Sequence, residues 1–185
     1  LAGWLIYIDA NDNGSFDDGE LATESDADGN YLFDGLAAGS YLVRAVQQDG
    51  WTQTLAGNDG EPVTLLADQD ITDIDFGSFA LAQIGGQVFD DADADGTLDA
   101  AETGLSGWLI TLDAGDDGSI DATTTSDEYG FYRFTNLGPG NYRIGQTLTA
   151  GWLLTSPSGG SHVASPTSGE DLGSQDFGVV QASSI

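Results

Sequence analysis

The chain contains no cysteine and no methionine, and because its three basic residues are all arginines it contains no lysine either. Without cysteine it has no disulfides, no thiolate metal ligands and no thiol nucleophile. Without lysine it has no Schiff-base chemistry and no side-chain amine for an intramolecular amide crosslink. Any stabilisation beyond ordinary packing must therefore come from something other than a covalent bridge.

Long apolar runs and positive charge are also missing. No apolar stretch approaches the roughly 18 residues of a membrane-spanning helix, and no basic segment leads into an apolar one at the start. The 31 acidic residues outnumber the 3 basic ones, for a formal net charge of −28. Such a charge repels phosphate backbones and anionic lipid headgroups, so we expect no nucleic-acid partner and no direct membrane contact. Bound cations are the first candidates for offsetting so many carboxylates.

An internal repeat divides the chain into two parts. The segment Leu-Ala-Gly-Trp-Leu-Ile at 1–6 returns as Leu-Ser-Gly-Trp-Leu-Ile at 105–110, and Asp-Phe-Gly at 75–77 returns at 176–178. This interval of about 100 residues is the usual size of one domain. We predict a first repeat over 1–80 that lacks its opening strand, and a second, complete repeat over 81–185 that ends where a third would start. The boundary is expected near Ser78 to Gln83, in a slice of a longer tandem array.

Alternating apolar side chains indicate β-strands in both repeats. A period of two runs through Trp108, Ile110 and Leu112, and pairs such as Tyr31 with Phe33 and Tyr132 with Phe134 repeat it. Turns rich in Gly and Asp separate these segments, and no segment keeps a period of 3.6. Hydrophobic residues make up 39% of the chain, enough for a packed core. The prediction is an all-β chain of tandem Greek-key β-sandwich domains, with a one-sheet barrel as the alternative.

The strongest motif is a twelve-residue loop at 91–102, Asp-Ala-Asp-Ala-Asp-Gly-Thr-Leu-Asp-Ala-Ala-Glu. Calcium takes about six to eight oxygen ligands, and a coiled loop supplies them from positions 1, 3, 5, 7, 9 and 12, with glycine at 6 for the sharp turn. Strands are expected on either side, so this is not an EF-hand in architecture. The predicted ligands are Asp91, Asp93, Asp95, the Thr97 carbonyl, Asp99 and both carboxylate oxygens of Glu102.

Two further loops follow the same pattern to different degrees. The loop at 9–20 is complete, with predicted ligands Asp9, Asn11, Asn13, Ser15, Asp17 and Glu20. The loop at 113–124 has glycine at position 3 and threonine at position 12, so it keeps Asp113, Asp117 and Asp121 and would need Asp116 or Asp127 as a substitute. We expect two Ca²⁺ sites and, with such a substitute, a third. The alternative interpretation is that Asp, Asn and Gly here only build turns.

Other acidic residues and the single histidine are assigned to structure rather than chemistry. Asp26 and Asp127 each precede a strand and are expected to form tight turns. The alternating residues Asp70, Asp73 and Asp75 are expected on one solvated strand face. His162 is predicted to be a solvated loop residue, because a catalytic triad is defined by geometry and not by an abundance of Ser and Asp. We therefore predict no catalytic residues and no enzyme.

The tryptophans and arginines occur at informative places. Trp4 matches Trp108, and Trp51 matches Trp152. Repetition at alternating strand positions predicts core or inter-domain packing, although exposed rings would suit a sugar-binding platform. The three arginines are expected to pair with carboxylates.

Taken together, these motifs resemble a known family. The segment Ile-Gly-Gly-Gln-Val-Phe-Asp at 84–90, the acidic loop that follows, Gly-Leu-Ser-Gly-Trp at 104–108 and Asp-Phe-Gly at 176–178 are similar to the SdrD B-like repeat, a calcium-binding relative of the Cna B-type domains of bacterial surface adhesins. The resemblance covers 84–178 and, without an opening strand, 1–77. It implies a prealbumin-like sandwich that serves as a rigid spacer in a secreted or surface-attached protein, with Asp91, Asp93, Asp95, Asp99 and Glu102 as ligands. The lysine-dependent isopeptide crosslink of many Cna B-type domains is chemically impossible here.

These observations predict a calcium-stabilised, non-enzymatic structural repeat of an extracellular stalk, adhesin or filament. Its expected partners are neighbouring repeats and other copies in a filament. One variant is that the first repeat accepts its missing strand from another chain. The alternative from another class is a glycan-binding module that uses the tryptophans together with calcium.

Overall fold

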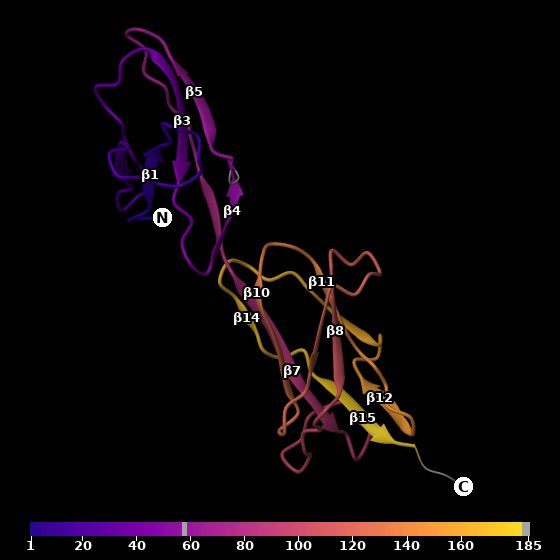
Figure 1. The fold of residues 1–185 in the computed structure, drawn as a ribbon. Helices are drawn as coiled ribbons and strands as arrows, with labels where there is room; N and C mark the ends of the chain where they lie inside the picture. The colour runs from indigo at the N-terminus through magenta and orange to yellow at the C-terminus, as the bar shows by residue number, and fades with distance from the viewer. Residues whose placement is uncertain (57–58, 183–185) are drawn as a thin grey trace. The chain divides into compact units, whose positions relative to one another are not determined.

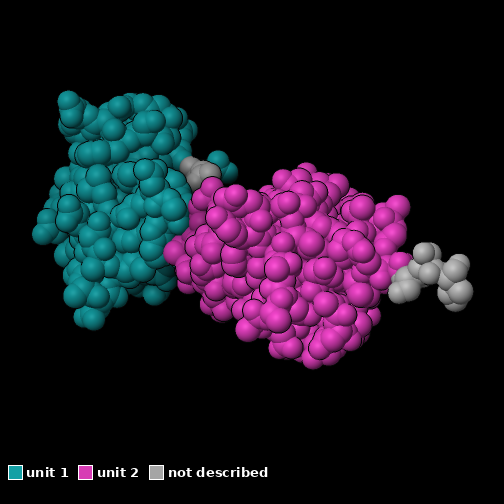
Figure 2. Space-filling model, turned by 90° about the horizontal axis from the view of Figure 1, so that it is seen from below, with its two compact units in different colours: residues 1–79 teal, residues 80–185 magenta. Residues whose placement is uncertain are grey.

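The structure is a computed structural model that describes residues 1–56 and 59–182. Every regular element in this part of the chain is a β-strand (Figure 1). The chain divides into two compact units, Leu1–Phe79 and Ala80–Ile185, which Figure 2 colours separately. Among the described segments there is no helix with the length and apolarity needed to cross a membrane.

Unit 2 is a sandwich of two sheets. In one sheet the strand order is β10, β7, β15 and β12, and the short β14 also pairs with β7. In the other the order is β13, β11, β8 and β9. The strands of the first sheet are β10 (Phe131–Leu137), β7 (Ala82–Asp90), β15 (Phe177–Gln181), β12 (Trp152–Ser156) and β14 (Asp171–Leu172). Those of the second are β13 (Ser161–Ala164), β11 (Tyr142–Gln146), β8 (Leu109–Ala114) and β9 (Ala122–Thr125).

The core of unit 2 forms because alternate residues of both sheets turn inward. Val88 and Phe177 from the first sheet and Ile110 and Ile144 from the second are at most 1% exposed. Along β10 the exposed and buried residues alternate, as the period of two predicts. The predicted all-β sandwich class is therefore confirmed.

Unit 1 repeats much of this plan with fewer strands. One sheet has the order β2, β1, β3 and β5, and a second contains β4 and β6. These strands are β1 (Leu5–Ile8), β2 (Ala22–Glu24), β3 (Gly39–Ala45), β4 (Trp51–Leu55), β5 (Glu61–Leu65) and β6 (Gly77–Ala80). The buried centre consists of Trp4, Ile6 and Val43, with half-buried rings such as Tyr31 and Phe76 packed against it.

Two strand predictions for unit 1 are wrong. Tyr31 and Phe33 lie in a segment without strand structure, although their counterparts Tyr132 and Phe134 lie in β10. The segment that carries Asp70, Asp73 and Asp75 is not a strand either. In unit 2 the equivalent segments pair with β7, and no described strand of unit 1 takes that place. A strand needs a partner for its backbone N–H and C=O groups, so the pattern alone is not sufficient.

Trp4 and Trp108 lie in the cores and the half-buried Trp51 and Trp152 pack against them, which agrees with the packing prediction. Trp4 and Trp108 are 8% and 6% exposed. Each meets the second tryptophan of its repeat edge to face, with ring centroids 5.4 Å apart for Trp4 and Trp51 and 5.6 Å apart for Trp108 and Trp152. A flat, exposed sugar platform is not available from rings packed in this way.

Candidate metal centre

The three acidic loops share one backbone conformation. In each, the fourth residue is in the left-handed region, with φ of 55° at Asp12, 60° at Ala94 and 54° at Asp116. The sixth residue is a glycine with positive φ in every case. The first carboxylate then accepts hydrogen bonds from the backbone N–H groups of the fifth and sixth residues. The first carboxylate is therefore fixed by the backbone of its own loop in the same way in all three cases.

The loop at 91–102 leaves the end of β7 and returns toward β8. Asp91 is fully buried, and its two carboxylate oxygens accept from Asp95 N at 3.1 Å and Gly96 N at 2.9 Å. The Glu102 carboxylate accepts from Ala92 N at 2.9 Å and from Asp99 N at 3.0 Å, which closes the loop. Because β7 and β8 belong to different sheets, this loop forms a corner between the two sheets.

Three of the predicted ligands of this loop are brought together. Carboxylate oxygens of Asp91, Asp93 and Asp95 all lie within 4.8 Å of one another, the one such acidic group in the part of the chain that the structure describes. Asp99 and Glu102 are not in this group, and Thr97 contributes a backbone N–H to the Asp95 carboxylate at 2.7 Å. Burial raises the pKa of Asp91, but hydrogen bonds, including those from Gly96 and Asp95, lower it by more. The pKa of this carboxyl therefore lies below its usual range. A buried, ionised carboxylate beside two others is a favourable place for a cation.

The loop at 9–20 has the same turn but a different electrostatic partner. Asp9 is 4% exposed, and its Oδ2 accepts from Gly14 N at 2.9 Å and from Arg44 Nε at 2.7 Å. A second guanidinium nitrogen of Arg44 lies 3.0 Å from Asp12 Oδ1. Burial raises the pKa of Asp9, and the Gly14 N–H and the Arg44 guanidinium bring it below its ordinary value. A positive charge therefore already lies against the first predicted ligand.

The remaining predicted ligands of this loop contact one another. The amide nitrogens of Asn11 and Asn13 donate to Asp17 Oδ2 at 3.0 and 2.7 Å. Ser15 N donates to Asn13 Oδ1 at 2.8 Å. Glu20 accepts from Ala10 N at 2.8 Å and from Asp17 N at 3.0 Å, so it has the same place as Glu102 in the other complete loop.

The incomplete loop at 113–124 is closed by Asp121. This carboxylate accepts from Ala114 N at 2.7 Å, which is the contact that a glutamate makes in the two complete loops. Asp113 accepts from Asp117 N and Gly118 N, and Asp117 accepts from Ser119 N. The two suggested substitute ligands have other partners. Asp116 is paired with Arg143, whose guanidinium lowers the pKa of that carboxyl, and Asp127 accepts from Tyr129 N and Phe131 N within its own turn.

The sequence analysis assigned the arginines no role at the acidic loops, but two of the three arginines contact these loops in the structure. All three arginines pair with carboxylates, as predicted: Arg44 with Asp9, Arg133 with Asp171 and Arg143 with Asp116. Two of them contact the fourth residue of an acidic loop, Arg44 at Asp12 and Arg143 at Asp116. Each of these arginines lies beside the start of its acidic loop because of the strand register, in which Arg44 is opposite Tyr7 and Arg143 is opposite Asp113. A correct strand pairing would therefore have predicted both contacts.

The prediction for His162 is wrong. The residue lies in β13, half-buried, with its Nε2 at 2.8 Å from the Asp176 carbonyl oxygen. Its ring contacts Phe177 at 5.0 Å between centroids. Small flanking residues suggested a loop, but the segment has an edge position beside β11 that supplies strand hydrogen bonds.

Comparison with known proteins identifies the relationship. The SdrD B-like domain model matches residues 82–181. Serine-aspartate repeat-containing protein F of Staphylococcus epidermidis is 32% identical over 200 residues, which cover 92% of this chain and 12% of that protein. Serine-aspartate repeat-containing protein D of Staphylococcus aureus is 32% identical over 157 residues, covering 80% of this chain and 12% of that protein.

Among solved structures, a shaft pilin SpaA from Lactobacillus rhamnosus GG aligns over 100% of this chain and 89% of its own, at 13% identity and a TM-score of 0.44. The chain spans about an eighth of the length of the two staphylococcal proteins. On the match to its second repeat, the chain belongs to the SdrD B-like domain family.

Proposed function

We propose that this chain is a calcium-stabilised structural repeat of a secreted or surface-attached bacterial stalk, adhesin or filament, without enzymatic activity. The observation that carries the calcium part is the loop at 91–102, where the buried carboxylate of Asp91 lies with Asp93 and Asp95 in one group. The relationship to serine-aspartate repeat-containing proteins supports an extracellular place next to other repeats. A disulfide-free and lysine-free domain has few other means of fixing such a corner.

The donor set of the loop at 91–102 suits calcium. Asp91, Asp93, Asp95, Asp99 and Glu102 supply hard carboxylate oxygens, and Thr97 supplies a backbone carbonyl. Without a cation, two carboxylates about 4 Å apart repel by roughly 1 kcal/mol in water and by several times that near a protein surface. Calcium, when bound, supplies the charge that reverses this repulsion. The residues themselves position the corner, because Glu102 and Asp91 are already held by backbone N–H groups.

The three loops are then expected to bind calcium with different strength. The loop at 91–102 is free of arginine contacts among the residues described, whereas Arg44 contacts Asp9 and Arg143 contacts Asp116. A guanidinium next to a ligand repels an incoming cation, and it already neutralises part of the negative charge that would attract the cation. We expect the order 91–102, then 9–20, then 113–124.

The experiment is a calcium titration of the whole chain by calorimetry, with the number of bound ions counted by native mass spectrometry. Asp93→Ala removes a ligand whose side chain is exposed, so the fold should persist while the strongest site is lost. Glu128→Ala is the matched control, since it removes an exposed acid in the same unit but outside the loops. The proposal fails if calcium does not bind, or if the two variants bind it equally well.

A further inference from the structure

One buried hydroxyl group next to the loop at 91–102 has no hydrogen-bond partner. Thr155 lies in β12 and is half-buried as a residue, but its Oγ1 atom is shielded from solvent and has no hydrogen bond to the residues that the structure describes. A buried hydroxyl without a partner costs about 1 to 3 kcal/mol. The few such groups that native proteins keep are commonly explained by a functional role or by a bound ion.

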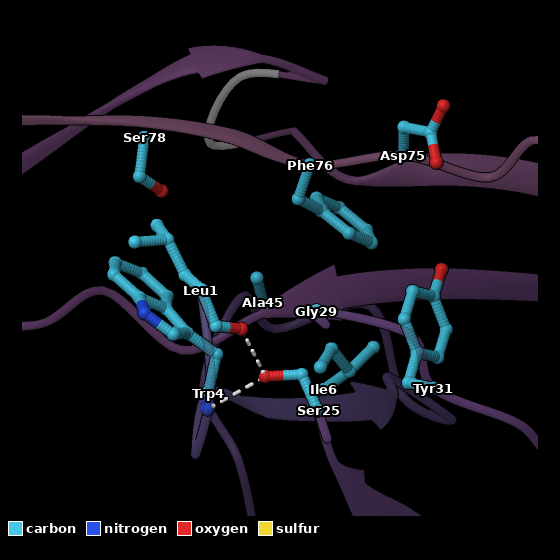
Figure 3. A pocket seen from close by; sticks show the side chains of 10 residues that line it. All are labelled: Leu1, Trp4, Ile6, Ser25, Gly29, Tyr31, Ala45, Asp75, Phe76 and Ser78. Atoms are coloured by element: carbon cyan, nitrogen blue, oxygen red, sulfur yellow. Dashed lines mark hydrogen bonds between the residues drawn. The ribbon is translucent and has the colours of Figure 1, made fainter. Parts of the chain in front are cut away.

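The buried serine hydroxyls of the chain, in contrast, are fully bonded. Ser25 Oγ donates to the Leu1 carbonyl oxygen at 2.7 Å and accepts from Trp4 N at 3.0 Å (Figure 3). Ser126 makes the corresponding two bonds in unit 2, also at 2.7 and 3.0 Å. The fold therefore satisfies buried hydroxyls where it can, and Thr155 is the exception.

The position of Thr155 follows from an irregularity in β12. Leu154 is opposite Val179 and Ser156 is opposite Gly178, so Thr155 is the extra residue between them, as in a β-bulge. A bulge re-aims the side chain that it carries. A Cβ atom built on Gly178 would lie 2.6 Å from Thr155 Oγ1, so the hydroxyl lies over β15 in the space that this glycine leaves free.

Asp91, the first predicted ligand of the loop, reaches the same place from the other side of β15. Strands β7 and β12 flank β15, and Asp91 N donates to the Val179 carbonyl oxygen at 2.9 Å. The turn of the loop also passes close to β12, because a Cβ atom at Gly96 would lie 3.6 Å from the Thr155 carbonyl oxygen. Burial raises the pKa of the Asp91 carboxyl, and the Thr155 hydroxyl is among the groups close enough to lower it. Side chains from β7 and β12 therefore meet beside the acidic group.

We propose that Thr155 is a positioning residue of the cation site at 91–102, an inference that rests on the proposed calcium function. When a cation binds, the Thr155 hydroxyl donates to the Asp91 carboxylate, and this bond holds the carboxylate in place and gives the hydroxyl its missing partner. A hydrogen bond to an ionised carboxylate is stronger than one between neutral groups. The contact ties the acidic loop to the edge strand β12. Loop spacing does not reveal this residue, because it comes from a strand later in the chain.

The proposed role gives the hydroxyl opposite effects with and without calcium. Without a cation the buried oxygen is unpartnered, so Thr155→Val, which removes the hydroxyl and nearly keeps the shape, should leave the thermal midpoint of the calcium-free chain unchanged or raise it. With calcium the hydrogen bond is made, so the same variant should weaken calcium binding about tenfold. A lower calcium-free midpoint together with an unchanged affinity would show that Thr155 is only structural, and would overturn the proposal.

The test is a calorimetric calcium titration of the whole chain and its variants, with thermal unfolding of each variant in chelator. Thr155→Val should lose about tenfold in affinity at the strongest site, and Thr155→Ser, which restores a hydroxyl, should recover most of that loss. Thr54→Val is the matched control. The Thr54 hydroxyl lies over Gly77 in the same way, 2.8 Å from a built Cβ atom, but it belongs to unit 1. The control should bind calcium as the parent chain does.

A second arm tests whether Thr155 acts through the acidic loop. In a chain that already carries Asp93→Ala, adding Thr155→Val should not weaken the remaining calcium binding, because both changes act on one site. Calcium should also slow amide hydrogen exchange in β12 of the parent chain, but not in Thr155→Val. If the parent chain binds calcium at this loop and Thr155→Val binds it equally well, this inference is wrong and the proposed function stands. If the parent chain binds no calcium, both are wrong.

Discussion

The two repeats have closely similar sequence patterns and yet differ in what completes them. Unit 2 contains β7 and closes its sheet, and its loop at 91–102 has no arginine contact among the described residues. Among the described strands of unit 1 none takes the place of β7, and the matching rings are half-buried, while the Arg44 guanidinium of β3 contacts Asp9 of the loop at 9–20. The comparison teaches that one loop conformation can form with or without a guanidinium beside its first carboxylate, so the two complete loops offer a cation different surroundings.

The largest effect is expected from filling the space that β7 needs. Gly86→Val places a side chain against the Gln175 carbonyl oxygen and should destabilise unit 2 by more than about 3 kcal/mol, because backbone cannot move aside cheaply. Denaturant unfolding followed by tryptophan fluorescence measures this. Gly159→Ala is the control, since a Cβ there meets no atom within 4 Å. A loss no larger than that of the control would show that β7 is not tightly fitted, and the comparison with unit 1 would collapse.

Removing the internal cation of unit 1 should have the next largest effect. Arg44→Gln leaves the buried Asp9 carboxylate without its ion pair and should cost about 3 kcal/mol in calcium-free buffer. Added calcium should restore much of this loss, because the loop at 9–20 then resembles the loop at 91–102. Thermal unfolding with and without calcium is the measurement. Arg133→Gln, which breaks a half-exposed pair, should change stability by less than about 1 kcal/mol.

Calcium removal should lower the thermal stability of the two units by different amounts. At a calcium concentration about 100 times the dissociation constant, binding contributes about 2.7 kcal/mol to the folded state. We expect a chelator to lower the thermal midpoint of unit 2 more than that of unit 1, where Arg44 remains in place. Differential scanning calorimetry of the chain and of Asp93→Ala distinguishes the two transitions. Equal shifts in both units would contradict the proposed ranking of the loops.

The smallest effect concerns Tyr31 at high pH. Burial, with added repulsion from Asp75 and Glu61, raises the pKa of Tyr31 from 10.0 to about 12 in the folded state. The folded chain therefore favours the neutral phenol. This contribution is complete below pH 10 and is lost as the pH rises through about 12. Tyr31→Phe should remove this part of the pH dependence of unit 1, as denaturant unfolding at a series of pH values from about 9 to about 12 would show.

Much of the fold was accessible from the order of residues. Period-two segments such as Trp108 to Leu112 predicted strands, and the structure confirms an all-β sandwich. The turns at Asp26 and Asp127 were also predicted, because a side-chain oxygen that accepts N–H groups two and four residues later is a local property. The calcium ligands themselves remain predictions, although three of those at 91–102 are brought together.

The errors came from contacts between distant segments. Tyr31 and Phe33 have the right alternation but no partner strand, and His162 has an unpromising neighbourhood but a strand partner in β11. Strand formation depends on the segment that lies beside it in the fold, and that segment is often far away in the sequence.

Residue spacing alone therefore determined the class of fold, the repeat and the shape of the acidic loops, because turns and alternation depend on neighbours along the chain. Only the tertiary structure decided which loop contains an arginine and which acidic residues meet in one group. It also decided that Tyr31 and Phe76 of unit 1 are half-buried, although their counterparts in unit 2 are buried. Those outcomes depend on pairings across tens of residues, such as Arg44 with Asp9, and the energy of a buried charge or an unpaired strand is set by such distant partners.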